Sequence, residues 1–433
     1  MRARSLPRDD STCGWFADLD PAEGHRLRAD EAADAVVIGA GFTGLAIARR
    51  LAELQPSWRV LVLDAQSAGF GASGRSSGFV VDLASFVSHL APDDAGRFIA
   101  LSRQGIANLR RQVLRHRLDC GWDETGWLHG AATDAGRESL EHLESWLESR
   151  GEPYESLGQR QLQNLTGSAY YRAAVRLPGS VLVQPAVLAR GLARALPGTV
   201  ELYENTPVYR LHHDGLWRLR TRGGEVSAPQ VFLAVNALLP TFGVLRDRLF
   251  PIWTFGSMTR PLRQQELDAC GGRRPWGLLA QDPLGSTVRR TADGRLLVRN
   301  SVLFSRSTSS SPAWRVAAAR HHRQALIDRF PTLGEVPFDH TWGGVMGMTR
   351  NGRHFFGCLG DRLWATGGFN AAGIALGTVA GQLLAERAIG HRSPALEAME
   401  ALPGPAWIPP EPIFGAGARW RLRRMRAEAG VWV

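Results

Sequence analysis

The stretch ADAVVIGAGFTGLAIARRLAELQPSWRVLVLDA, residues 33–65, decides the fold of this chain. Residues 35–38 and 60–63 are short apolar runs rich in β-branched side chains, which is typical of buried parallel strands. Between them, apolar residues recur at helical spacing from 45 to 54, with charged residues on the opposite face. The stretch therefore predicts a strand, a helix and a second strand that together form a parallel βαβ unit.

The turn between the first strand and the helix is GAGFTG, residues 39–44. Gly39 allows a tight turn, Gly41 lets the backbone approach a pyrophosphate, and Gly44 lets helix and strand pack closely. Asp64 ends the second strand twenty residues after Gly44, the interval expected for a carboxylate that binds a ribose. An ordinary glycine-rich turn and a simple strand-end cap are the alternatives, but the complete set of flanking elements favours a dinucleotide-binding site.

A second glycine-rich stretch, SAGFGASGRSSGF, covers residues 67–79 directly after the second strand. Its residues are mostly glycine, serine and alanine, so the backbone can lie close to a large flat ligand. Free N–H groups and hydroxyls in such a segment can meet phosphate or ring oxygens. The stretch predicts a second contact with the same dinucleotide.

The composition is that of a globular protein. The chain has 433 residues, of which 44% are hydrophobic and 21% charged, enough for two domains and a large core. The four cysteines lie far apart without a C-x-x-C pair, which indicates neither a metal site nor a disulfide framework. The N-terminal residues lack the apolar segment of a signal peptide, and no apolar run approaches the ~18 residues of a membrane span. We therefore expect a cytoplasmic protein.

The net charge of +10 comes from arginine alone, because all 51 basic residues are arginine and the sequence contains no lysine. The densest basic run is RWRLRRMR, residues 419–426. A solvated tail that packs on the protein is one interpretation, and a weak contact with a membrane surface is another. No nucleic-acid-binding module accompanies the basic residues, so we expect no nucleic-acid partner.

GAGFTG, Asp64 and GFGASGR at 69–75 together resemble the D-amino-acid oxidase-like family of FAD-dependent oxidoreductases, in particular its glutamylputrescine oxidase and glycine and sarcosine oxidase branch. Further segments are similar to the family in matching order along most of the chain: residues 181–196, 200–208, 231–240 and 342–386. The resemblance implies that the dinucleotide is FAD. The residues that it implies for FAD binding are Gly39, Gly41, Phe42, Thr43, Gly44, Asp64, Ala65, Gly71, Ala72, Ser73, Gly74, Arg75, Ser76, Val208, Ala234, Asn236, Gly368, Phe369, Ala371, Ala372, Gly373 and Ile374.

The closing part of the chain predicts a strand at 363–366, a turn at 367–370 and a helix of small residues at 371–386. Three glycines repeat every four residues on one face of this helix, at positions 373, 377 and 381. Such a face suits close packing against a flavin ring or, alternatively, against another helix. A helix start carries free N–H groups and partial positive charge, so one directed at the flavin would stabilise its reduced form.

We therefore predict an α/β fold: a discontinuous Rossmann-like FAD-binding domain and a second α+β substrate domain built on a mixed sheet. The FAD-binding domain is expected to comprise residues 30–90, 175–245 and 345–392. The substrate domain is expected to comprise 91–174, which looks mostly helical, and 246–344, which looks like strands with turns. An N-terminal extension and a basic C-terminal tail would then cover residues 1–29 and 393–433.

The resemblance also implies a reaction. Family members oxidise a carbon–nitrogen bond by moving a hydride equivalent to the flavin, and water hydrolyses the resulting imine. This step needs correct placement and a dry site rather than a metal or a nucleophile. Arg289, on the expected pocket sheet, could pair with a substrate carboxylate through a bidentate contact. The candidate catalytic residues, each with an ordinary loop, packing or surface role as the alternative, are Ser76, Ser77, Arg289, His354 and Asn370.

FAD is expected to be non-covalent, because serines and glycines occupy the regions where relatives attach the flavin. Sarcosine oxidase-like relatives place a lysine beside the flavin to promote the reaction with oxygen, and this chain has none. The expected partners are therefore a small amine or amino acid and either oxygen or another electron acceptor. Two alternatives stay open. One is an FAD dehydrogenase that passes electrons to a quinone or a protein, and the other is a biosynthetic flavoprotein whose pocket has diverged at residues 370–372.

Overall fold

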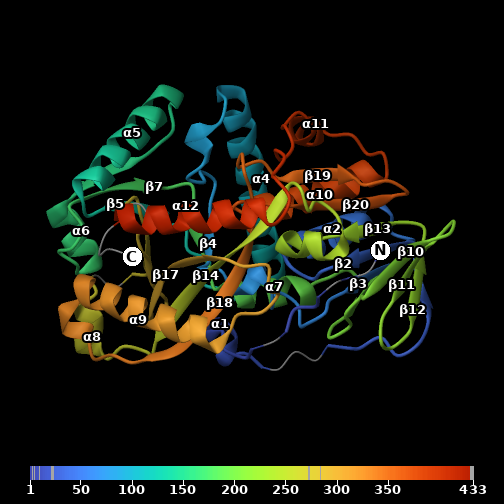
Figure 1. The fold of residues 1–433 in the computed structure, drawn as a ribbon, viewed down its shortest axis with the longest axis horizontal. Coiled ribbons are helices and arrows are strands. Elements are labelled where there is room, and N and C mark those ends of the chain that lie inside the picture. Colours follow the sequence, from blue (N-terminus) through green and yellow to red (C-terminus); the bar gives the residue numbers. More distant parts are fainter. Residues whose placement is uncertain are drawn as a thin grey trace.

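The computed structural model describes the chain except for residues 2, 4, 9, 21–23, 272–273, 283 and 430–433. Parts of the predicted extensions at 1–29 and 393–433 therefore lie outside the described residues. Two large sheets organise the molecule, and Figure 1 shows them in separate halves, each with its own helices. The predicted fold class, an α/β fold with mixed sheets, is confirmed.

A six-stranded sheet carries the predicted dinucleotide-binding unit. Its strand order is β19-β20-β13-β2-β3-β9, and all neighbours pair in parallel except β19 with β20. The predicted strands at 35–38 and 60–63 are confirmed as β2 and β3, and every residue in both is buried. The bounds are β2 (Ala35–Ile38), β3 (Val60–Leu63), β9 (Val200–Tyr203), β13 (Val231–Leu233), β19 (Phe355–Cys358) and β20 (Leu363–Gly367).

The two faces of this sheet are covered differently. Alternate strand residues such as Val37 and Val62 join a core with helices α2, α4, α7 and α10, whereas Val36 and Leu61 join a core with a four-stranded sheet of order β1-β12-β11-β10. The helices are α2 (Phe42–Leu54), α4 (Pro92–His116), α7 (Pro185–Arg194) and α10 (Ala375–Ala388). The strands of the smaller sheet are β1 (Glu31–Ala32), β10 (Arg210–His213), β11 (Trp217–Arg220) and β12 (Glu225–Ala228).

The glycine face of α10 packs against α2. A Cβ added at Gly377 would lie 2.7 Å from Thr43 Oγ1, and one at Gly381 would lie 2.4 Å from the Thr43 carbonyl oxygen. Among the described residues, a Cβ added at Gly373 would meet only the Phe369 side chain, at 3.7 Å, an ordinary van der Waals contact. Two of the three glycines therefore serve close helix packing, the alternative to contact with a ring.

The start of this helix was predicted wrongly. It begins at Ala375 instead of residue 371. Asn370 and Ala371 have φ angles of 51° and 71°, a left-handed conformation that cannot continue into a right-handed helix. The polypeptide therefore makes an extra turn between strand β20 and helix α10.

An eight-stranded mixed sheet forms the second half, in the order β18-β14-β17-β16-β15-β5-β7-β6. Its strands are antiparallel to their neighbours except for the parallel pair β15 and β5. The bounds are β5 (Trp127–Ala131), β6 (Glu155–Gly158), β7 (Ala173–Leu177), β14 (Leu249–Thr259), β15 (Trp276–Ala280), β16 (Thr287–Arg290), β17 (Leu296–Phe304) and β18 (Phe338–Thr349). Strands β7 and β18 run across the predicted domain boundaries at 174/175 and 344/345, so the division of the chain into domains stays a prediction.

Shorter elements complete the fold. The region expected to hold strands with turns also contains the long helix α9, whose first turn is capped by the Ser311 hydroxyl. The remaining helices are α1 (Gly14–Ala17), α3 (Ala72–Arg75), α5 (Asp134–Arg150), α6 (Gln159–Thr166), α8 (Gln264–Asp268), α9 (Pro312–Arg329), α11 (Pro394–Glu400) and α12 (Ile413–Ala429). The 3-10 turns and the last strand pair are η1 (Val87–His89), η2 (Asn236–Phe242), η3 (Pro331–Leu333), β4 (Phe79–Val80) and β8 (Val181–Leu182). Within the part of the chain that the structure describes, no helix combines the length and the apolar character needed to cross a bilayer.

Candidate functional site

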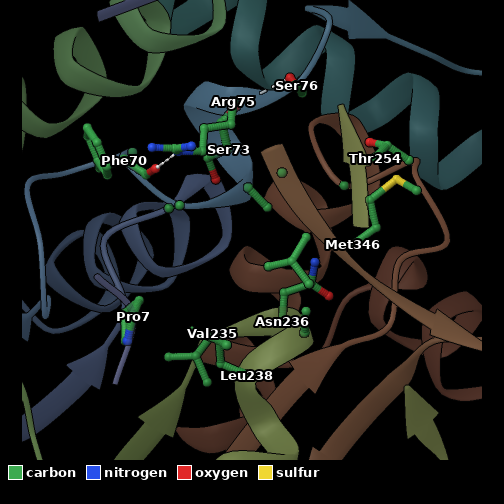
Figure 2. Close-up of a pocket in the computed structure, with 18 of the residues that line it drawn as sticks. Pro7, Phe70, Ser73, Arg75, Ser76, Val235, Asn236, Leu238, Thr254 and Met346 are labelled. Carbon is green, nitrogen blue, oxygen red and sulfur yellow. Dashed lines mark hydrogen bonds between the residues drawn. The ribbon is translucent and has the colours of Figure 1, made fainter. Parts of the chain in front are cut away.

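A cavity of about 410 Å³ lies where the two large sheets meet. Its wall takes residues from the GAGFTG turn, the glycine-rich stretch, the η2 turn, the eight-stranded sheet and the N-terminal segment. Figure 2 shows Thr254 and Met346 of the sheet near Asn236 of η2, with Ser73 and Arg75 of the glycine-rich stretch across the same space. The cavity thus joins the two stretches that the sequence singled out to the sheet expected to bind substrate.

The GAGFTG turn has the geometry that its glycines predict. Gly39 has a φ of 107°, and a Cβ added there would lie 2.7 Å from the Ala234 carbonyl oxygen. A Cβ on Gly44 would lie 1.8 Å from the Gly39 carbonyl oxygen, inside the backbone of the turn itself. Helix α2 begins at Phe42, with no side-chain cap from Gly41. Its first turn therefore presents backbone N–H groups and partial positive charge at the cavity wall.

Ser73 connects the two glycine-rich segments. Its hydroxyl accepts a hydrogen bond from the Phe42 N–H at 3.1 Å, and it lies 2.6 Å from the position of a Cβ on Gly41. Gly41 is therefore needed for this contact as well as for the expected approach of a pyrophosphate. The phosphate-binding turn and the second stretch form one surface.

Asp64 lies at the carboxyl end of β3, partly buried in the cavity wall. Its Oδ2 accepts from the Ala40 N–H at 2.6 Å and its Oδ1 from the Gln66 N–H at 2.8 Å. Burial raises the pKa of this carboxyl to about 6; the two N–H donors lower it, and Glu204 raises it further. The backbone bonds fix the carboxylate in place and leave lone pairs for a ribose hydroxyl.

The glycine-rich stretch is held by a buried arginine. Arg75 donates from Nε to the Phe70 carbonyl at 3.1 Å, from Nη1 to the Gly343 carbonyl at 2.8 Å and from Nη2 to Asp10 at 2.6 Å. Figure 2 shows the bond to Phe70. The Arg75 and Asp10 side chains are only 9% and 15% exposed. Arg75 therefore links the stretch to strand β18 and to the N-terminal segment.

Asp10 is a contact that the sequence did not reveal, because nothing in the N-terminal residues marks it. Its second oxygen accepts from the Ser310 hydroxyl at 2.9 Å and lies 3.4 Å from Arg315. Although burial raises the pKa of Asp10, the hydrogen bond and charge of Arg75 outweigh it and lower the pKa. The Leu6 carbonyl accepts from Thr308 at 2.9 Å, so the N-terminal segment spans the cavity wall between the two halves.

Two tryptophans fix the backbone beside Arg75. Trp342 donates its indole N–H to the Arg75 carbonyl at 3.0 Å, and Trp15 donates to the Ser76 carbonyl at 2.8 Å. The Ser76 hydroxyl itself donates to the Ser73 carbonyl at 3.3 Å. Both predicted serines, Ser76 and Ser77, line the cavity.

Asn370 lines the cavity, but its side chain serves the turn before α10. Its Oδ1 accepts from the Thr349 N–H at 2.9 Å and its Nδ2 donates to the Gly368 carbonyl at 2.7 Å. The Gly368 N–H in turn donates to Asn236 Oδ1 at 2.9 Å. These bonds hold the left-handed residues Asn370 and Ala371 in place. The geometry gives Asn370 a role in positioning the backbone that borders the cavity.

Most of the residues implied for FAD binding come together in the cavity wall. Those that line it are Gly39, Gly41, Phe42, Thr43, Asp64, Ala65, Gly71, Ala72, Ser73, Arg75, Ser76, Val208, Ala234, Asn236, Phe369, Ala371, Gly373 and Ile374. Those that do not are Gly44, Gly74, Gly368 and Ala372. Their individual contacts with FAD stay predictions.

Arg289 and His354 are not brought to the cavity wall. Arg289 Nη1 donates to the carbonyls of Ser77, Gly78 and Val183 at 2.8, 3.3 and 2.6 Å. His354 is buried, which lowers its pKa to about 4, and its Nε2 lies 3.1 Å from Met399 Sδ. In this geometry both side chains hold the surrounding structure together.

Arg299 is the cavity residue that sequence reasoning missed. It lies on β17 on the same face of the sheet as Arg289 and directly opposite Thr287 of β16. Its Nη2 donates to Thr287 Oγ1 at 2.6 Å, both residues line the cavity, and burial lowers the pKa of the guanidinium to about 10. The available signal was an arginine directly after the apolar run LLV in the stretch LLVRNSVLF, residues 296–304.

Comparisons with known proteins agree with this geometry. The model of the family described as FAD dependent oxidoreductase (DAO) matches residues 34–387. "Probable oxidoreductase OrdL" of Haemophilus influenzae is 28% identical over 381 residues, covering 83% of this chain and 84% of that protein. "Gamma-glutamylputrescine oxidoreductase" of Escherichia coli is 29% identical over 371 residues, covering 82% and 83%. The crystal structure of glycine oxidase from Geobacillus kaustophilus matches the fold with a TM-score of 0.72 at 21% identity, covering 84% of this chain and 96% of that one.

Proposed function

The chain belongs to the family of FAD-dependent oxidoreductases, and from this premise we propose that it oxidises the carbon–nitrogen bond of an amine or amino acid. The observation that supports the proposal is a single cavity that joins a dinucleotide-binding turn to a sheet of the second half. The names of relatives, gamma-glutamylputrescine oxidoreductase and glycine oxidase, point to the same substrate class. The carbon beside the nitrogen would lose a hydrogen with two electrons to FAD and the nitrogen a proton to water, and water would hydrolyse the imine to a carbonyl compound and an amine or ammonia.

The residues present fit FAD. The left-handed Gly39 and the first turn of α2, where Ser73 accepts from the Phe42 N–H, suit a pyrophosphate, and the anchored Asp64 suits a ribose. When bound, FAD supplies the two-electron acceptor. The chain holds the cofactor by these groups and shapes the space beside it with the backbone of the glycine-rich stretch, which Arg75 fixes.

We infer that water, and none of the charged residues in the described cavity wall, removes the proton from the substrate nitrogen. They are Arg8, Asp10, Asp64, Arg75 and Arg299, and no histidine, lysine, cysteine, tyrosine or glutamate accompanies them among the described lining residues. Asp10 is paired with Arg75, and Asp64 lies at the nucleotide end. We infer that the substrate enters with a neutral nitrogen and that the protein contributes orientation and exclusion of water. The value of kcat/KM should then rise with pH and follow the pKa of the substrate nitrogen, shifting from one substrate to another.

An anaerobic mixing experiment tests the proposal. Purified yellow protein is mixed without oxygen with secondary amines, amino acids and γ-glutamylated amines, and the flavin absorbance band is followed. Bleaching by one class identifies the substrate, and a band that no amine or amino acid bleaches contradicts the proposal.

We also propose that the flavin reacts slowly with oxygen and passes electrons to another acceptor. The absence of lysine from the chain supports this, since no ammonium can lie beside the flavin. After anaerobic bleaching, air is admitted to one sample and a quinone analogue to another. Faster return of the band with the quinone is expected, and immediate return in air contradicts this part of the proposal.

A further inference from the structure

We propose that Arg299, held by Thr287, binds a carboxylate of the substrate, so that the substrate class narrows to amines that carry a carboxylate. The inference rests on the proposed function for the amine group of the substrate, and on the geometry of the cavity for the carboxylate group. It differs from the sequence-based expectation, which assigned this contact to Arg289.

The first step is the charge balance of the cavity wall. Arg8 is exposed, and Arg75 is neutralised by Asp10. Asp64 belongs to the β3 end of the cavity, beside the GAGFTG turn. Arg299 forms no ion pair with any carboxylate that the structure describes. The part of the cavity next to the eight-stranded sheet therefore carries an uncompensated positive charge.

The second step is the hydrogen-bonding capacity of Arg299. A guanidinium has five N–H donors, and within the described residues the only acceptor of Arg299 is the Thr287 hydroxyl, at 2.6 Å. That bond fixes the orientation of the planar group because Thr287 is its direct cross-strand partner. The remaining donors are available to a ligand in the cavity. Removing the charged guanidinium from water without a partner costs free energy, because its hydration is lost. An anionic ligand would replace that lost hydration.

Arg289 shows what a structural arginine on the same face looks like. It is the cross-strand partner of Leu297, two residues along each strand from the Thr287–Arg299 pair. Its guanidinium is 5.4 Å from the Trp15 ring and donates to three backbone carbonyls. Among the described residues, no backbone carbonyl accepts a hydrogen bond from Arg299. The two residues lie on the same face of the sheet, on the neighbouring strands β16 and β17. Of the two, only Arg299 has N–H donors available for a ligand in the cavity.

The third step is the choice of anion. The wall beside Arg299 includes the apolar side chain of Leu297, on the same face of the sheet, and Gly256, the cross-strand partner of Arg299 on β14. A carboxylate matches a planar guanidinium in a bidentate contact. A substrate that spans from the flavin to this sheet would be oriented by that contact, which makes Arg299 a specificity-determining residue.

The test compares charged and neutral ligands of the same shape on the oxidised holoenzyme. Benzoate and benzamide are titrated separately, with acetate and acetamide as a smaller pair, and binding is read from the perturbation of the flavin absorption spectrum. In the unmodified protein the carboxylate should bind at least about tenfold more tightly than its amide, as expected for a hydrogen-bonded charge pair. Arg299→Gln should reduce the carboxylate to the affinity of the amide, and Arg299→Lys should keep part of the difference.

Melting temperature and FAD content are measured on the same samples. Arg299→Gln should keep its FAD and melt at the same or a higher temperature, because it removes a buried charge without a carboxylate partner. Thr287→Val should weaken carboxylate binding less than Arg299→Gln does, since it only frees the orientation of the guanidinium.

Three results would overturn the inference: equal affinity of carboxylate and amide in both probe pairs, equal weakening of both by Arg299→Gln, or partial loss of FAD from that variant with unchanged carboxylate binding in the fraction that keeps FAD. The last would place Arg299 at the cofactor. These outcomes are distinguishable from failure of the proposed function, because the probes report binding without turnover. If the protein binds carboxylates more tightly than amides but no amine reduces its flavin, the anion site is supported and the proposal of amine oxidation is contradicted.

Discussion

The two ends of the cavity are built in different ways. The end expected to hold the nucleotide is lined mainly by residues within 39–43 and 64–76, which belong to the GAGFTG turn, the end of β3 and the glycine-rich stretch that follows it. The sheet end takes side chains from β5, β14, β15, β16, β17 and β18, which enter from distant parts of the chain. The backbone geometry at the nucleotide end follows from the local sequence. At the sheet end, the side chains that face the cavity depend on which face of each strand is covered by segments distant in the sequence.

The largest effect is expected from Gly44→Ala at the nucleotide end. The added methyl would lie 1.8 Å from the Gly39 carbonyl oxygen, so the turn must deform. We expect loss of FAD and a fall in unfolding free energy of about 3 kcal/mol or more, the range of severe overpacking. FAD content and melting temperature measure both effects. Gly198→Ala is the matched control, since a Cβ there meets nothing within 4 Å; equal behaviour of the two variants would refute the role of this turn.

Asp64→Asn should weaken FAD binding by about 1–3 kcal/mol, the value of a charge-assisted hydrogen bond. In the apoprotein, burial raises the pKa of Asp64 to about 6, whereas ribose hydroxyls bind the ionised form. FAD binding must therefore release a proton at low pH, so affinity should fall as the pH decreases through 6. Titration of apoprotein with FAD between pH 5 and 8 measures this. A pH profile in Asp64→Asn as steep as in the unmodified protein would exclude Asp64 as its source.

Asp10→Asn tests the link between the two ends. It leaves the Arg75 guanidinium buried with only carbonyl partners, at a cost of about 2 kcal/mol. Because the pKa of Asp10 is lowered in the folded protein, its contribution is present above the ordinary carboxyl pKa and disappears as the pH falls below it. Melting temperature should therefore differ between the variant and the unmodified protein at neutral pH, and the two should converge in acid. A constant difference at every pH would contradict this assignment.

The smallest effect is expected from Arg289→Gln. Three backbone carbonyls lose their hydrogen-bond donor, which destabilises the protein, but a buried charge is removed, which stabilises it. The unfolding free energy should therefore fall by only about 1 kcal/mol. Melting temperature should fall slightly while the affinity for benzoate stays unchanged. Loss of benzoate affinity without a change in melting temperature would indicate that Arg289, and not Arg299, binds the carboxylate.

The same contrast explains what could be predicted. Strands β2 and β3 and the Gly39 turn follow from side-chain pattern and φ requirements within thirty residues, and the structure reproduces them. The start of α10 was misplaced by four residues because Thr349 holds the left-handed Asn370 and Asn236 holds the preceding Gly368, and the local pattern contains neither partner. The sequence placed an arginine, Arg289, on the expected pocket sheet. It could not show that Trp15 and neighbouring carbonyls enclose Arg289 while Arg299 stays open to the cavity.

The connectivity of the six-stranded sheet has a consequence for synthesis. Strand β20 pairs with β13, and α10 packs its glycines onto α2, although more than three hundred residues separate the two helices. A growing chain completes β2, α2 and β3 early, but the surface of α2 that meets Gly377 and Gly381 stays open until α10 has left the ribosome. Contacts of such long range form slowly and late. The capacity to retain FAD should therefore arise only when nearly the whole polypeptide has emerged.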